Sequence, residues 1–220
     1  MPSGYKFVIA DDHPLFRGAL KQALSGVSNV ATILEAGDFD SAKAIVAGND
    51  DIDLVLLDLA MPGAAGLSGL ISLRGINATV PLVVVSAHDD PETIRRSLEL
   101  GASGFISKSA SMEEIRTAVE TVLGGGVTAP AGIDLGVERD PEISDLIKRL
   151  QSLTPQQTRV LGMLAEGLLN KQIAYELGVS EATIKAHVSA VLHKLAVDSR
   201  TQAVILLSRI GADPLQTTAG

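Results

Sequence analysis

The chain has 220 residues, of which 46% are hydrophobic and none is cysteine. This length suffices for one large or two small domains, and the composition excludes both a disordered chain and a disulfide scaffold. The absence of cysteine also suits a reducing cytosol. The longest apolar runs are far shorter than the roughly 18 residues of a membrane span, and residues 1–5 lack a targeting pattern. We therefore expect a soluble cytoplasmic protein that does not use a membrane.

The formal net charge of −8 argues at first against a nucleic-acid partner. The charge is unevenly divided, however. Residues 150–220 contain six Lys and Arg against five Asp and Glu, a net of +1, whereas residues 1–149 contain 12 against 21, a net of −9. The acidity therefore belongs to the first part of the chain, and the second part remains a candidate for binding DNA, with a weak electrostatic component.

The first half alternates short apolar runs with amphipathic stretches. Four of the five runs hold three or more successive apolar residues, glycine included, which is typical of strands buried on both faces. Five strand–helix repeats predict an α/β fold with a doubly wound, five-stranded parallel sheet, whose active crevice lies at the carboxyl ends of the strands. The predicted strands are residues 6–10, 30–36, 53–58, 81–86 and 104–107. The predicted buried faces are Leu15, Ala19, Ala23 and Leu24 in the first helix, and Ile115, Ala118, Val119 and Val122 in the fifth.

A glycine- and proline-rich segment beginning at residues 124–126 indicates a linker. Within it, residues 138–150 are charged, and propensity leaves open whether they are helical. We therefore predict an α/β domain at residues 1–124, a linker at 125–149, a helical domain at 150–212 and a flexible tail at 213–220.

Short capped helices replace the strands after residue 153. Thr154 is followed by Pro155 and, three residues on, by Gln157, which together form a capping box. A second helix at about residues 170–177 ends at Gly178, which suits a left-handed cap. Ser180 then caps a third helix, and a fourth, mostly apolar helix is predicted at residues 201–210.

Polar residues follow the predicted strands where each strand ends. Asp11 and Asp12 follow the first strand, Asp58 ends the third, Ser86 ends the fourth and Lys108 follows the fifth. In a parallel sheet these ends share one edge, so the side chains converge. Three carboxylates need a cation, and their oxygen ligands suit Mg²⁺. The hydroxyl and the ammonium fit an arriving phosphoryl group, with an acyl phosphate on Asp58 as the natural product.

This half resembles the receiver domain of two-component response regulators over about residues 5–126. The resemblance rests on IADDHP at residues 9–14, LDLAMPG at 57–63, VVSA at 84–87 and GASGFISK at 101–108. It implies a flavodoxin-like fold that accepts a phosphoryl group from a sensor histidine kinase. The residues after Lys108 depart from the pattern, since Ser109 stands where many receivers have proline, which leaves the geometry of that peptide bond open.

The roles that this resemblance implies can be assigned position by position. Asp58 would be the phosphorylated nucleophile. Asp12, Asp58 and the backbone carbonyl of Ala60 would hold Mg²⁺, with Asp11 acting directly or through water. Ser86 would bond the phosphoryl oxygens, Lys108 would pair with them, and Phe105 would be an aromatic switch. Phe105 is equally well explained as core filler beside a strand.

Residues 171–195 have the layout of a helix-turn-helix. Ala174 is small where two helices cross, Gly178 makes the turn, and apolar residues at core spacing bury the third helix. Its outward positions are small or polar, as a helix in the major groove requires. The buried positions are Ile184, Val188, Val191 and Leu195, and the outward ones are Ala182, Lys185, Ala186, Ser189 and His193.

The second half looks like the four-helix DNA-binding domain of the NarL/FixJ (LuxR-type) regulators over roughly residues 150–211. EGLLNKQIA at residues 166–174 and VSEATIKAHV at 179–188 carry the match. The resemblance implies that bases of double-stranded DNA are read by Lys185, Ala186 and Ser189, and that Thr183, His187, Lys171 and Lys194 face the backbone. It also implies a homodimer through the fourth helix.

These features predict a response regulator, not an enzyme, in which phosphorylation of Asp58 controls DNA binding. One hypothesis is that the unphosphorylated receiver covers the recognition helix and that phosphorylation allows dimerisation on paired half-sites. Two alternatives stay open. The first is a hydrolase that uses Asp58 as its nucleophile. Such an enzyme needs a second carboxylate two residues after the nucleophile to act as acid and base, and that position is occupied by Ala60. The second is a regulator that works through protein contacts without phosphorylation.

Overall fold

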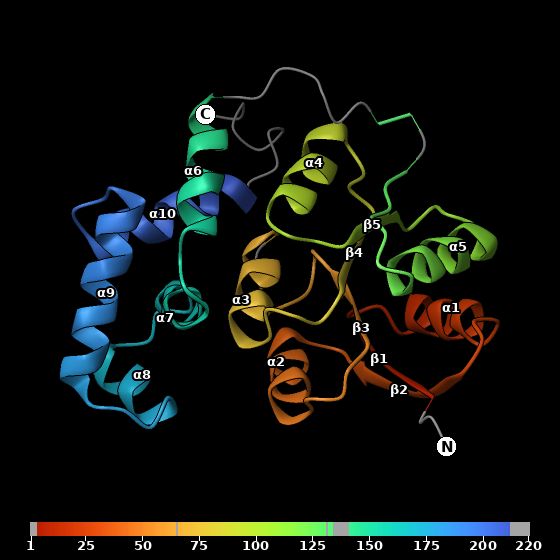
Figure 1. Cartoon of the computed structure of the whole chain (residues 1–220), viewed down its shortest axis with the longest axis horizontal. Helices are drawn as coiled ribbons and strands as arrows, with labels where there is room; N and C mark the ends of the chain where they lie inside the picture. Colours follow the sequence, from red (N-terminus) through yellow and green to blue (C-terminus); the bar gives the residue numbers. More distant parts are fainter. Residues whose placement is uncertain (1–3, 65, 131, 134–140, 212–220) are drawn as a thin grey trace. The chain divides into compact units, whose positions relative to one another are not determined.

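The computed structural model describes residues 4–64, 66–130, 132–133 and 141–211. The chain forms two compact units, one built mainly from the first 137 residues and one mainly from residues 138–220. The first is an α/β sandwich and the second is helical (Figure 1). The predicted fold classes of the two halves are both confirmed. The proposed domain limits remain a prediction.

The sheet of the first unit is parallel and five-stranded, with the order β2-β1-β3-β4-β5. The reversal of strand order beside β1 is the switch point at which doubly wound sheets open a crevice. The predicted strand ranges agree with the observed ones to within one residue. The strands are β1 (Tyr5–Ala10), β2 (Val30–Ala36), β3 (Leu54–Asp58), β4 (Leu82–Ser86) and β5 (Gly104–Ser107).

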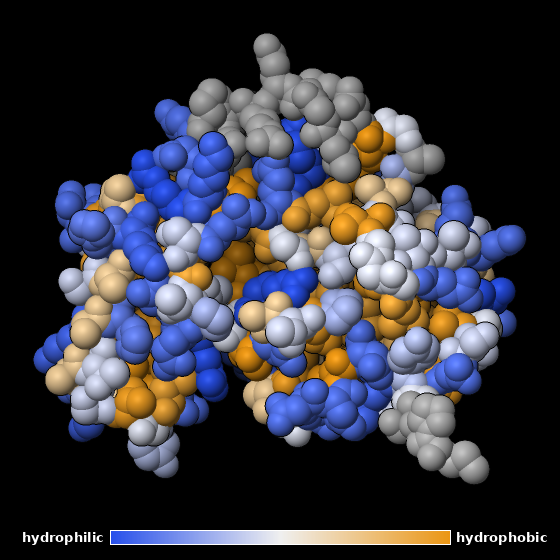
Figure 2. All heavy atoms as spheres, in the orientation of Figure 1, coloured by the Kyte–Doolittle hydropathy of each residue, from blue (hydrophilic) through white to orange (hydrophobic). Residues whose placement is uncertain are grey.

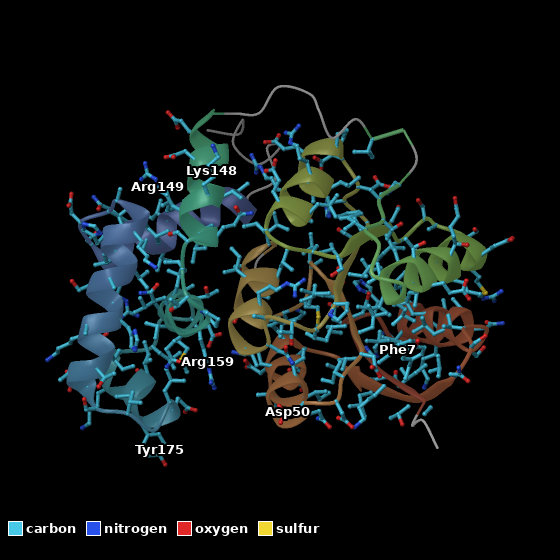
Figure 3. All side chains as sticks on the ribbon, viewed as in Figure 1. Phe7, Asp50, Lys148, Arg149, Arg159 and Tyr175 are labelled. Atoms are coloured by element: carbon cyan, nitrogen blue, oxygen red, sulfur yellow. The ribbon has the colours of Figure 1, made fainter. Side chains whose placement is uncertain are left out.

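Helices cover both faces of this sheet. In Figure 1, α1 and α5 lie on one side of the strands and α2, α3 and α4 on the other. One buried cluster joins α1 and α5 to alternate residues of β1, β3 and β4, including Phe7, which Figure 3 labels. The alternate residues Val8, Val55 and Val84 are buried as well, so the central strands bury both faces as predicted. The helices are α1 (Pro14–Leu24), α2 (Phe39–Gly48), α3 (Ser68–Ile76), α4 (Pro91–Glu99) and α5 (Met112–Leu123).

Strand β2, the one predicted strand without three successive apolar residues, is an edge strand and leaves Thr32 and Glu35 exposed. One detail differs from the sequence-based prediction. The predicted buried face of α1 is wrong at Leu15, which is 92% exposed. The apolar stripe that packs on the sheet starts one position later, at Phe16, and continues through Leu20. The buried face predicted for α5 is confirmed in full.

The second unit consists of five described helices. The N-terminal capping box of α7 is present, with Thr154 and Gln157 exchanging hydrogen bonds. Gly178 has a φ of 64°, as the predicted left-handed turn requires. The core of the unit joins Val160 and Leu164 to α8 and α9. The helices are α6 (Pro141–Gln151), α7 (Pro155–Ala165), α8 (Asn170–Glu176), α9 (Glu181–Leu195) and α10 (Arg200–Gly211).

The sequence left open whether residues 138–150 are helical. The structure shows that helix α6 spans Pro141–Gln151. Its side chains Leu146, Ile147 and Leu150 are buried, and the helix contacts α9. The predicted domain boundary at residue 150 therefore falls inside α6, a helix that packs against the helix-turn-helix.

Candidate acidic site and nucleic-acid interface

The carboxyl ends of β1 and β3 bring the predicted acidic residues together. Ligand atoms of Asp11, Asp12, His13 and Asp58 all lie within 4.8 Å of one another. Asp11 and Asp58 are each only 1% exposed, whereas Asp12 is partly exposed. Two nearly buried carboxylates this close repel each other strongly, so the site depends on cations for its stability.

Lys108 supplies one such cation from the residue after β5. Its ammonium nitrogen lies 2.7 Å from Asp58 Oδ2 and 2.7 Å from Asp11 Oδ2. It also lies 5.0 Å from the ring centre of Phe16, a cation–π contact. Burial alone lowers the pKa of Lys108, but the bonds to Asp11 and Asp58 outweigh burial and raise that pKa above its ordinary value. The lysine is therefore held charged against both carboxylates.

The donor set of this site fits a hard divalent cation. Among the described residues, the buried oxygens Asp11 Oδ2 and Asp12 Oδ1 make only ion-pair contacts, to Lys108 and His13 respectively, at 2.7 Å each. Asp58 Oδ1 accepts the backbone N–H of Ala60 at 3.0 Å, which fixes the carboxylate. Carboxylate oxygens on a partly open edge are the ligands that Mg²⁺ prefers. The acidic cluster is thus consistent with a divalent metal site.

Ser86 and Phe105 complete the set of predicted residues on this unit. Ser86 is 1% exposed at the end of β4, and its hydroxyl oxygen accepts the backbone N–H of His88 at 3.0 Å. The backbone N–H of Lys108 donates to the Ser86 carbonyl at 2.8 Å, which ties the ends of β4 and β5 together. Phe105 is 1% exposed in β5, so its ring lies in the core.

Sequence reasoning missed His13 as a member of the site. Its Nδ1 lies 2.7 Å from Asp12 Oδ1 and 3.9 Å from Asp58 Oδ2. The residue follows Asp12 directly, and this adjacency was the available signal. The Lys108–Ser109 peptide bond, left open above, is not cis, since the described residues contain no cis peptide.

The helix α9 presents the outward face that the sequence predicts. Ser180 caps its N-terminus by accepting the backbone N–H of Thr183 at 3.1 Å. Ile184, Val191 and Leu195 are buried on the opposite side. The predicted base-reading residues Lys185, Ala186 and Ser189 are exposed, as are Thr183 on α9 and Lys171 on α8, while His187 is half-buried. Lys185 pairs with Glu181 one turn earlier at 3.1 Å.

Lys194, by contrast, is engaged inside the helical unit. Its ammonium donates to the Ser152 carbonyl at 2.7 Å and to Gln157 Oε1 at 2.9 Å. Arg149 of α6 donates in the other direction, to the Leu195 carbonyl at 3.0 Å. Figure 3 labels Arg149 on α6. These bonds attach the last turn of α9 to the α6–α7 junction.

A parallel sheet with clustered carboxylates at its carboxyl edge, joined to a helix-turn-helix unit, defines a signal-responsive DNA-binding regulator. A family model described as "Response regulator receiver domain" matches residues 7–120, and one described as "Bacterial regulatory proteins, luxR family" matches residues 151–207. The chain belongs to the response regulators that join a receiver domain to a LuxR-type DNA-binding domain. This family consists of transcription regulators, which excludes the hydrolase alternative.

Curated relatives match over nearly the whole chain. The chain is 42% identical over 207 residues to the glycerol metabolism activator of Pseudomonas putida, covering 91% of this chain and 94% of the relative. It is 34% identical to the nitrate/nitrite response regulator protein NarP of Escherichia coli K12, covering 92% and 94%. Its identity to NarL of the same strain is 32%, covering 90% and 92%.

Solved structures share the fold at low sequence identity. The response regulator RcsB of Salmonella typhimurium superposes with a TM-score of 0.56 at 22% identity, covering 94% of this chain and 99% of that chain. A structure of an RcsB–DNA complex gives 0.55 at 22% identity, covering 93% and 98%. Within the described part of this chain, no helix combines the length and the apolarity needed to cross a membrane.

Proposed function

We propose that this response regulator is switched by Mg²⁺-dependent phosphorylation of Asp58 by a sensor histidine kinase. The observation that carries the proposal is Asp58 itself, a nearly buried carboxylate fixed by the Ala60 N–H and paired with Lys108 beside Asp11 and Asp12. A carboxylate that lies beside the Lys108 ammonium and a proposed Mg²⁺ site is suited to attack phosphorus, because both cations offset the charge of the phosphoryl group.

The reaction follows from these contacts. A carboxylate oxygen of Asp58 attacks the phosphorus of a phosphohistidine on the kinase. The new P–O bond gives an acyl phosphate, while the P–N bond breaks and its electron pair stays on the imidazole, which takes up a proton. Lys108 exchanges its pairing with Asp58 for the phosphoryl oxygens. Ser86, whose oxygen already accepts the His88 N–H, retains its own hydrogen for donation to the phosphoryl group.

The proposed metal ligands are Asp12, Asp58 and the carbonyl of Ala60, with Asp11 acting directly or through water. When bound, Mg²⁺ would offset the negative charge that builds up on the transferring phosphoryl group. Asp11 has the further role of holding Lys108, since it accepts the same ammonium as Asp58. Phe105 is proposed as a switch residue that responds to phosphorylation.

The output of the proposed switch is sequence-specific binding of double-stranded DNA by a homodimer. Lys185, Ala186 and Ser189 would read base edges from the exposed face of α9. Thr183, His187 and Lys171 would contact phosphates, and Lys194 would do so only after leaving its bonds to Ser152 and Gln157. Solved structures with RcsB dimers on DNA support this output by analogy of fold.

Phosphorylation of the purified full chain by acetyl phosphate tests the proposal. We expect a mass increase of one phosphoryl group that requires Mg²⁺ and is lost in Asp58→Asn. The matched control is Asp51→Asn, because Asp51 is exposed and pairs with Lys6 near the opposite end of β3. Labelling that persists in Asp58→Asn would contradict the assignment, and no labelling of the unmodified chain would favour the phosphorylation-independent alternative.

A further inference from the structure

A short segment after α5 returns along the sheet and pairs with the outer edge of β5. Thr128 forms a parallel bridge with Gly104. The Phe105 N–H donates to the Thr128 carbonyl at 3.0 Å, and the Thr128 N–H donates to the Ser103 carbonyl at 3.3 Å. We call residues 127–130 the linker strap, because the chain continues from them toward the helical unit.

Gly104 is shaped to receive the linker strap. A Cβ atom added there would lie 2.4 Å from Thr128 Cγ2 and 3.3 Å from the Thr128 carbonyl oxygen. Real Cβ atoms do not approach other atoms this closely, so a side chain at position 104 requires the Thr128 methyl group to move and the Thr128 carbonyl to shift by a few tenths of an ångström. The glycine thus allows the close backbone approach on which both hydrogen bonds depend.

The attachment of the linker strap is weak as well as close. The linker strap borders a cavity of about 530 Å³ that is partly open to solvent. Both Phe105 and Ser107 of β5 border this cavity, together with Thr128, Ala129 and Pro130 of the linker strap. Val127 is 66% exposed. Residues 128–130 are only half-buried, so fewer apolar contacts support these two backbone hydrogen bonds than support those of a buried strand.

Strand β5, which pairs with the linker strap, is also connected to Asp58 through Lys108. Lys108 follows β5 directly and bonds Asp58, while Phe105, three residues earlier, bonds Thr128. Strand β5 has only four residues, so Phe105 and Lys108 are about 10 Å apart along the backbone. A phosphoryl group on Asp58 would draw Lys108 from the carboxylate to the new oxygens and displace the end of β5. The Phe105 N–H would then change its direction relative to the linker strap.

We propose that the linker strap is a phosphorylation-sensitive attachment, docked on β5 when Asp58 is free and released when Asp58 is phosphorylated. This inference rests on the proposed phosphorylation of Asp58. Release would free four residues of the linker and extend the connection to the helical unit by up to about 13 Å. The device would convert a change at the acidic site into a change in the length of free linker.

Amide hydrogen exchange on the full chain tests the release directly. The Phe105 and Thr128 amides are the reporters, because they donate the two docking bonds. With Mg²⁺ and beryllofluoride as the phosphoryl mimic, we expect both amides to exchange at least about fivefold faster, the lower end of usual coupling between sites. The Gly126 amide, which donates to the Thr121 carbonyl at the end of α5, should not change.

Three variants separate docking from phosphorylation. Gly104→Ala should show fast exchange of the Thr128 amide without any mimic. Adding Thr128→Ser to Gly104→Ala removes the Cγ2 atom of the 2.4 Å contact and should restore protection. Val127→Ala, at an exposed position of the linker strap, should behave as the unmodified chain. Because linkage is reciprocal, Gly104→Ala should also bind beryllofluoride more tightly, by at most the factor by which the mimic weakens docking.

The outcomes distinguish this proposal from the proposed function. If Asp58 takes up the phosphoryl group of acetyl phosphate while exchange of the Phe105 and Thr128 amides stays unchanged, the linker strap proposal is overturned and the proposed function stands. If Asp58 is not phosphorylated and does not respond to the mimic, both are overturned. Protection that is lost in Gly104→Ala but not restored by Thr128→Ser would contradict the docking geometry.

Discussion

At the scale of single residues, the position of a strand end is what makes the acidic site predictable. Asp58 and Ser86 end strands whose apolar runs are plain in the sequence, and Asp11 and Lys108 follow such strands directly. Which atoms meet was not predictable. Lys108 contacts two carboxylates at once and lies over Phe16, and these contacts depend on a flexible side chain crossing between loops. Strand periodicity fixes where a residue lies, but not the rotamer that it adopts.

Leu15 shows the same limit on α1 and gives a prediction about stability. Leu20 is buried in the core cluster of the sheet, whereas Leu15 is 92% exposed. Leu20→Ala should lower the free energy of unfolding of the first unit by about 2–5 kcal/mol, and Leu15→Ala by less than about 0.5 kcal/mol. Hydrogen exchange of the buried β1 amides measures both. Equal losses in the two variants would contradict the observed face of α1.

Asp90 gives a prediction about pH. Its carboxylate caps α4 by accepting the Glu92 and Thr93 backbone N–H groups and the Thr93 hydroxyl. Partial burial raises the pKa of Asp90, but the bonds from Thr93 and Glu92 prevail and hold that pKa below its ordinary value. The carboxylate therefore stabilises the fold above the ordinary pKa of about 3.9. This contribution is lost as the pH falls through the lowered pKa.

The corresponding test compares the unmodified chain with Asp90→Ala by urea unfolding at several pH values. At neutral pH the substitution should cost about 1 kcal/mol, the usual value of an N-terminal cap. The difference between the two proteins should shrink as the pH falls below about 4. A difference that does not vary with pH would show that the cap works without the charge of Asp90.

At the scale of elements, all five strands and the helices with caps were predictable, because local signals agree with burial there. The capping box at Thr154, the left-handed glycine at Gly178 and the apolar stripe of α5 are such cases. Helix α6 was left undecided because its sequence is charged. What stabilises it is packing of Leu146 and Ile147 in the helical unit, a tertiary effect that propensity does not contain. The pairing of residue 128 with β5 escaped prediction for the same reason.

The junction between α6 and α9 gives a prediction at this scale. Arg149 donates to the Leu195 carbonyl at the end of α9, and a hydrogen bond from a charged group to a carbonyl contributes about 1.5–3 kcal/mol. Arg149→Met keeps the apolar stem and removes the donor. We expect faster hydrogen exchange of the Ala196 and Val197 amides, which close the last turn of α9.

Arg149 also pairs with Asp145 of its own helix at 2.6 Å, and this pair supplies the control. Asp145→Asn breaks the exposed ion pair and leaves the bond to Leu195 possible. Because exposed pairs contribute little, this variant should exchange as the unmodified chain does. A loss of protection in Asp145→Asn equal to that in Arg149→Met would assign the effect to the ion pair instead.

At the scale of the whole molecule, the division of charge explains how a chain of net charge −8 contains a DNA reader. The acidic excess belongs to the first 149 residues, and part of it is gathered at Asp11, Asp12 and Asp58. The helical unit has little positive charge, and several of its cations are engaged internally: Arg149, Lys194 and Arg200 bond backbone carbonyls. Among the described residues, few cations on α8 and α9 remain for phosphates.

Lys171 and Lys185 give the final prediction, which concerns the salt dependence of DNA binding. Lys171 is exposed on α8 and makes no ion pair with any residue that the structure describes. If each chain of a dimer places Lys171 on one phosphate, Lys171→Ala should reduce the slope of log K against log salt by about 1.8, weakening binding to all sequences alike. Lys148→Ala, at an exposed position of α6, should leave the slope unchanged.

Lys185→Ala should instead weaken binding by about 1–3 kcal/mol on the specific site alone, since a base contact discriminates between sequences. Titration of the phosphorylated full chain on specific and unrelated duplexes at several salt concentrations measures both effects, and an equal loss on both duplexes in Lys185→Ala would move Lys185 from the bases to the backbone.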